Sequence, residues 1–62
     1  MPFIEVKAFE HRFEDDEKAA LLIKKLTEAF GEVYGEEAQR ETEVVLQGVS
    51  KRHWGFGGER RV

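Results

Sequence analysis

The stretch DEKAALLIKKLTEAFGEV, residues 16–33, decides the fold of this chain. Apolar side chains recur in it at intervals of three and four residues, the spacing of one face of an α-helix. They are Ala19, Leu22, Ile23, Leu26, Ala29, Phe30 and Val33. Acidic residues crowd its start, as the helix dipole favours, and Gly35 suits a left-handed stop after the last turn. Gly31 weakens that turn without abolishing it, so the sequence predicts an amphipathic helix that begins at about Asp16.

Strand-like segments precede and follow this helix. Residues 3–9 (FIEVKAF) alternate with the period of a strand, which gives one wholly apolar face (Ile4, Val6, Ala8) and one mixed face (Phe3, Glu5, Lys7, Phe9). Residues 42–49 have a continuous apolar centre from Val44 to Leu46, typical of a strand covered on both faces. Residues 10–15 and the acidic residues 35–41 are expected to be loops.

The order strand, helix, strand predicts a β-α-β unit with parallel strands and a right-handed crossover. Residues 50–58, rich in aromatics and glycine, are expected to form a loop or tight hairpin. The expected fold is therefore α+β, with a short C-terminal hairpin, in a single domain over residues 1–62.

A chain of 62 residues and 7.2 kDa buries only about 60% of its unfolded surface. It contains no cysteine, which excludes disulfides and thiolate zinc sites, and two histidines cannot form a structural metal cage alone. Because one helix covers only one face of a two-stranded sheet, and two strands are not stable alone, we expect an obligate oligomer.

The net charge of −3 is unevenly distributed. Residues 1–50 hold six Lys and Arg against twelve Asp and Glu, whereas residues 51–62 hold four against one. The acidic body disfavours nucleic-acid binding, although a small nucleic-acid or peptide binder using residues 51–61 with Trp54 and Phe56 is a third alternative. The basic end is better suited to a small anion. No apolar run reaches the ~18 residues of a membrane span, and no leader is evident, so the expected location is cytoplasmic.

Pro2 is the most unusual candidate for chemistry. The initiator methionine is normally removed before proline, which would leave a secondary amine. An α-amino group titrates at about 7.7–8.0, and an apolar, cation-lined pocket lowers its pKa further. Such an amine is suited to general acid–base catalysis near neutral pH. By contrast, Ser50 is the only serine and has no triad, and residues 55–58 lack the lysine of a phosphate loop.

The sequence resembles the 4-oxalocrotonate tautomerase family, whose members are chains of about this length with a catalytic amino-terminal proline. The resemblance covers nearly the whole chain. It rests on PFIEV at residues 2–6, Arg12, LIKKLTEA at residues 22–29, and HWGFGG at residues 53–58, where the family carries an aromatic followed by a Gly-x-Gly-Gly turn.

This resemblance implies a keto–enol tautomerase, an isomerase of small unsaturated keto or enol carboxylic acids, assembled as dimers into a hexamer. It implies that Pro2 shuttles the proton, that Arg12 binds a substrate carboxylate, and that Trp54 is the pocket aromatic. Phe9 would place a backbone amide near the substrate. Neither a cofactor nor a metal is expected.

Glu43 departs from the family pattern, which places a second arginine there to polarise the substrate oxygen. A carboxylate opposes a developing enolate, so Arg40, Arg52, the basic tail or a partner chain would have to supply this cation. Alternatively, the chain is a non-catalytic or partner-dependent subunit of a hetero-oligomer. A retained Met1 would favour that alternative, because Pro2 would then be a tertiary amide.

Overall fold

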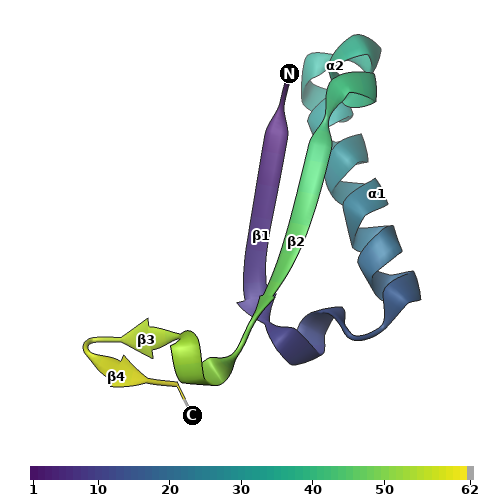
Figure 1. Ribbon diagram of the computed structural model, residues 1–62. Coiled ribbons are helices and arrows are strands. Elements are labelled where there is room, and N and C mark those ends of the chain that lie inside the picture. The colour runs from purple at the N-terminus through teal and green to yellow at the C-terminus, as the bar shows by residue number, and fades with distance from the viewer. Residues whose placement is uncertain (62) are drawn as a thin grey trace.

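The computed structural model describes residues 1–61, and it has the predicted β-α-β order (Figure 1). Strand β1 (Phe3–Phe9) and strand β2 (Glu43–Val49) form a parallel pair, in register from Phe3↔Glu43 to Phe9↔Val49. Helix α1 (Asp16–Tyr34) connects them. The C-terminal hairpin pairs β3 (Gly55–Phe56) with β4 (Glu59–Arg60) in antiparallel fashion. The α+β prediction is therefore confirmed.

Helix α1 begins and ends where the sequence indicates. The Asp15 side chain accepts hydrogen bonds from the backbone N–H groups of Glu17 (2.9 Å) and Lys18 (3.2 Å), which caps the first turn. Gly35, with φ +103°, ends the helix and donates its N–H to the Gly31 carbonyl. A Cβ at Gly31 would collide with the side chain of Gln39. Glycine in the last turn of α1 thus permits close packing by the segment that follows.

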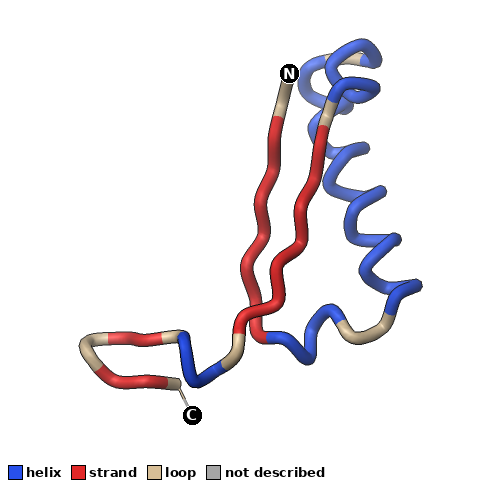
Figure 2. Tube along the Cα trace, viewed as in Figure 1, coloured by secondary structure: helices blue, strands red, loops and turns tan. Residues whose placement is uncertain are grey.

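That following segment is not the predicted loop. Residues Glu36–Glu41 form a short helix, α2, which folds back on the end of α1 (Figures 1 and 2). The positive φ of Gly35 reverses the chain direction, and Gln39 packs on Gly31. The Thr42 hydroxyl donates to the Ala38 carbonyl (2.8 Å), so β2 begins at Glu43 rather than Thr42. In the first connection, Glu10–Phe13 form a 3₁₀ turn within the expected loop.

Helix α1 covers one face of the sheet (Figure 2). The half-buried strand residues on that face are Ile4, Val6, Ala8, Val44 and Leu46. On the opposite face Phe3 remains 58% exposed and Val45 43% exposed, and none of residues 1–61 is fully buried. The apolar centre of β2 is therefore covered on only one face within a single chain, and not on both faces as the sequence predicts.

We predict that the open sheet face is an assembly surface. Replacing Val45 by lysine should raise the dissociation constant of the assembly by about 100-fold or more, because association would remove its ammonium group from water, a cost that its register partner Glu5 offsets only in part. Sedimentation velocity over a concentration series measures this change, with Val45→Ile as the matched control that keeps the surface apolar. Assembly of Val45→Lys at wild-type concentrations would contradict the prediction.

Of the helices in residues 1–61, none combines the length and the apolar character that crossing a bilayer requires.

Candidate functional site

The C-terminal hairpin is shaped by a two-residue glycine turn. Gly57 (φ +60°) and Gly58 (φ +89°) both have positive φ, the backbone conformation that tight hairpin turns require and that glycine adopts without strain. The backbone N–H of Arg61 donates to the Trp54 carbonyl (2.8 Å), which continues the β3–β4 pairing by one residue pair. Trp54 and Arg61 are thereby held opposite each other at the base of the hairpin.

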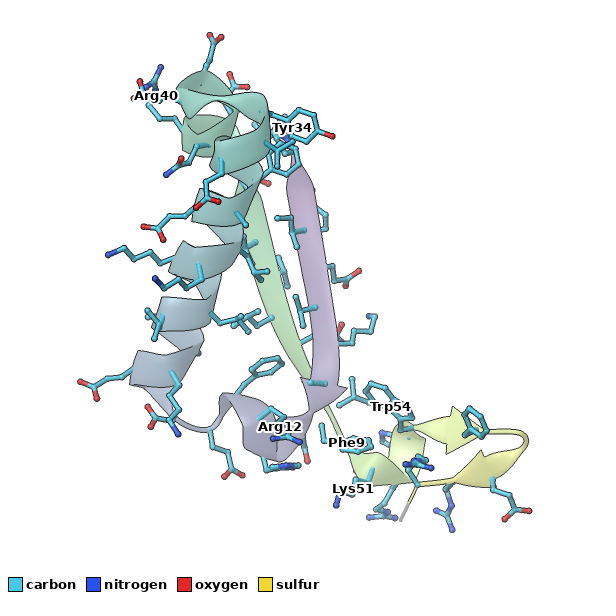
Figure 3. All side chains as sticks on the ribbon, turned by 180° about the vertical axis from the view of Figure 1, so that it is seen from behind. Phe9, Arg12, Tyr34, Arg40, Lys51 and Trp54 are labelled. Carbon is cyan, nitrogen blue, oxygen red and sulfur yellow. The ribbon has the colours of Figure 1, made fainter. Side chains whose placement is uncertain are left out.

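A hollow of about 410 Å³ lies between the base of the hairpin and the end of β1. It is lined by three cationic side chains, three aromatic side chains and one alanine: Lys7, Arg12, Arg61, Phe9, Trp54, Phe56 and Ala8. Three of the four residues singled out in the sequence, Phe9, Arg12 and Trp54, are thus brought together. Figure 3 shows these three at the end of the sheet that carries the hairpin.

The Phe9 ring contacts three side chains around the hollow. It meets the Trp54 ring edge to face, with centroids 4.8 Å apart and planes at 68°, a favoured aromatic geometry. It also stacks on His11 at 6.3 Å, and the Lys51 ammonium lies 5.4 Å from its centroid. The contact with Phe9 holds Trp54 against the end of β1, so these two aromatic side chains form an apolar side of the hollow.

The cations of the hollow differ in their availability. Lys7 Nζ contacts Gln47 Oε1 (2.7 Å) and Glu5 Oε2 (3.3 Å), so its charge is already partnered. Within residues 1–61 the ion pairs are Lys7–Glu5 and Lys25–Glu28, and neither includes Arg12 or Arg61. No acidic side chain lines the hollow. The available charged donors are therefore two guanidinium groups, which bind carboxylates in a planar, bidentate manner.

A second hollow of about 530 Å³, which shares Phe9 with the first, has different chemistry. Glu10 and Glu14 line it together with His11, Ser50 and Lys51. Its two carboxylates oppose the entry of an anion, so the smaller hollow is the better anion site. Across residues 1–61, no group of three or more His, Cys, Asp or Glu side chains is arranged to hold a metal ion.

Pro2 does not reach this hollow within one chain. The seven residues of β1 separate Pro2 from Arg12, and a strand of that length spans about 23 Å. The Pro2 carbonyl accepts a hydrogen bond from the Glu43 N–H (2.9 Å), which holds the amino-terminal segment to the start of β2. Figure 3 places Arg40 at this end of the molecule, opposite Arg12 and Trp54.

Arg61 is the guanidinium of the hollow that the sequence does not identify individually. The sequence indicates the basic end only as a group, because four cations occur in residues 51–62. The signal that selects Arg61 is the hairpin register. Pairing of Gly55 with Arg60 makes Trp54 the partner of Arg61, and side chains of successive strand residues point to opposite faces.

Comparison with known proteins places the chain in context. The sequence model of the family described as "Tautomerase enzyme" matches residues 2–61. The matched range includes Pro2 and every residue of the hollow. No curated protein sequence matches the chain.

Proposed function

The chain belongs to the tautomerase family, and from this premise we propose that it is an isomerase that transfers a proton within a small unsaturated keto or enol carboxylic acid. The observation that carries this proposal is the acid-free hollow, in which Arg12 lies beside aromatic walls. A guanidinium binds the carboxylate of such an acid, while Trp54 and Phe9 contact its unsaturated carbon chain. The backbone amide of Phe9 is proposed as a further substrate contact.

Pro2 is the proposed acid–base group. With Met1 removed, its secondary amine accepts a proton from the enol hydroxyl or an acidic carbon of the substrate. The resulting ammonium returns a proton to another carbon of the same molecule. The substrate gains and loses one proton, so the product is an isomer and no cofactor is consumed. An apolar wall such as Trp54 favours the neutral amine over its charged form.

A complete site needs two copies of the chain, because about 23 Å of β1 separates Pro2 from Arg12. Members of this family usually form small oligomers. We propose that Pro2 of one copy lies beside the hollow of another, in dimers that assemble into a hexamer. Support comes from the open sheet face with Phe3 and Val45, which needs a cover of its own.

Because a glutamate occupies position 43, another residue must supply the cation that polarises the substrate oxygen. The Glu43 N–H donates to the Pro2 carbonyl, so the backbone of Glu43 lies next to the amino-terminal segment. Arg40 lies at the same end of the molecule, whereas Arg52 lies in the 3₁₀ turn before the hairpin. Of the two, Arg40 is better placed to offset the charge of Glu43.

Replacing Pro2 by alanine tests the proposal. We expect kcat to fall by about 10²-fold, because the alanine amine keeps its basicity but loses the ring that fixes its position. Ketonisation of a 2-hydroxydienoate and of phenylenolpyruvate, followed by ultraviolet absorbance, measures turnover. Circular dichroism and sedimentation establish that the variant is folded and assembled. Unchanged turnover by such a folded variant would refute the catalytic role of Pro2.

A second candidate function is that of a non-catalytic or partner-dependent subunit, favoured by a glutamate at position 43, where the family pattern has an arginine. It predicts that the chain purifies from its native source with a second small chain that carries its own proline and the missing arginine. An active assembly of this chain alone would exclude it.

A further inference from the structure

Arg61 occupies a position that the proposed chemistry leaves unassigned. The hollow contains two guanidinium groups, Arg12 from the 3₁₀ turn after β1 and Arg61 from the end of the hairpin. They come from opposite ends of the sequence. The hydrogen bond from the Arg61 N–H to the Trp54 carbonyl holds Arg61 at the base of the hairpin, where it lines the same hollow as Arg12. Neither forms an ion pair with a carboxylate of residues 1–61.

The electrostatic setting of this pair is unusual for the chain as a whole. Acidic residues outnumber Lys and Arg by 13 to 10, yet none of them lines the hollow. Two like charges that face one cavity without a counter-charge repel each other, and an anion that accepts hydrogen bonds from both relieves that repulsion. A ligand with two anionic groups is therefore favoured over a ligand with one.

We infer that Arg61 is a second anion-binding residue of this hollow and that it binds, together with Arg12 of the same chain, the second anionic group of the ligand. The inference rests on the proposed function for the identity of the ligand as an unsaturated acid. The anion site itself depends only on the geometry of the hollow.

The hairpin provides a matched control for this inference. Arg60 precedes Arg61 and carries the same charge, but it pairs with Gly55 and does not line the hollow. Both arginine side chains are exposed, so their removal leaves no cavity. The hydrogen bond from Arg61 to Trp54 uses the backbone N–H, which alanine retains.

The experiment compares fumarate with crotonate, which share a four-carbon unsaturated chain but carry two and one carboxylates. Binding to the assembled protein is followed by the fluorescence of Trp54, the only tryptophan, and by calorimetry. We expect Arg61→Ala to weaken fumarate binding by about tenfold, the loss typical of one charge-assisted hydrogen-bonded pair. We expect little effect on crotonate, partial recovery in Arg61→Lys, and no effect of Arg60→Ala on either probe.

Equal losses in Arg60→Ala and Arg61→Ala would reduce the effect to net charge and overturn the inference. Absence of fumarate binding to the wild-type protein would also overturn it. Turnover is measured separately on the same samples. If the wild-type protein shows no Pro2-dependent turnover but binds fumarate in an Arg61-dependent manner, the proposed function is refuted and the anion site stands.

Discussion

A chain that retains Met1 will be inactive as a tautomerase, with kcat lower by up to about 10⁴-fold, the upper range for the contribution of a positioned acid–base group. With methionine attached, the nitrogen of Pro2 belongs to a tertiary amide, whose lone pair is delocalised into the carbonyl and is not basic. Methionine removal would restore the secondary amine. The effect should exceed that of Pro2→Ala, because alanine still presents an amine.

This comparison isolates the chemistry, because Met1 contributes little to the fold. Its side chain is 84% exposed, and the amino-terminal segment is held instead by the hydrogen bond between the Glu43 N–H and the Pro2 carbonyl. The retained form is obtained by expression with methionine aminopeptidase inhibited, and intact mass identifies both forms. Circular dichroism and sedimentation should not distinguish them. Equal turnover by the two forms would exclude the amine of Pro2 as the base.

The part of the fold that is periodic could be predicted from the sequence. The apolar spacing from Ala19 to Val33 predicts α1, and the alternation in residues 3–9 predicts β1, because each pattern extends over several turns or strand residues. Helix α2 has only six residues, too few for an apolar period to develop, so the acidic composition of this segment predicts a loop instead. Its formation depends on Gly35 and on packing against Gly31.

The candidate site shows a similar division. The resemblance to the 4-oxalocrotonate tautomerase family implies Phe9, Arg12 and Trp54, and the structure brings them to one hollow. The sequence alone does not distinguish Arg61 from the other basic residues of the C-terminal end, because its place in the hollow depends on the register of the hairpin. The separation of Pro2 from Arg12 follows from the length of β1, which the alternation in residues 3–9 predicts. The structure adds that Pro2 is held at the start of β2, away from the hollow.

Mixed assemblies of two inactive variants will recover activity if the site is shared between copies. Pro2→Ala lacks the proposed ring amine, and Arg12→Ala lacks the carboxylate ligand, so each alone should be strongly impaired. When the two chains are unfolded together and reassembled in equal amounts, each Pro2 meets an intact Arg12 only by pairing with the other variant. Random assembly into a symmetric oligomer then restores about one site in four.

The recovery of about a quarter of wild-type kcat per site contrasts with the outcome for a site contained within one chain. In that case every chain of the mixture carries one defect, and no mixture regains activity. There are three controls: each single variant reassembled alone, and a mixture of Pro2→Ala with a chain that carries both substitutions. All three should stay at background. Since β1 holds Pro2 and Arg12 about 23 Å apart in one chain, we expect recovery only in the mixture of the two single variants.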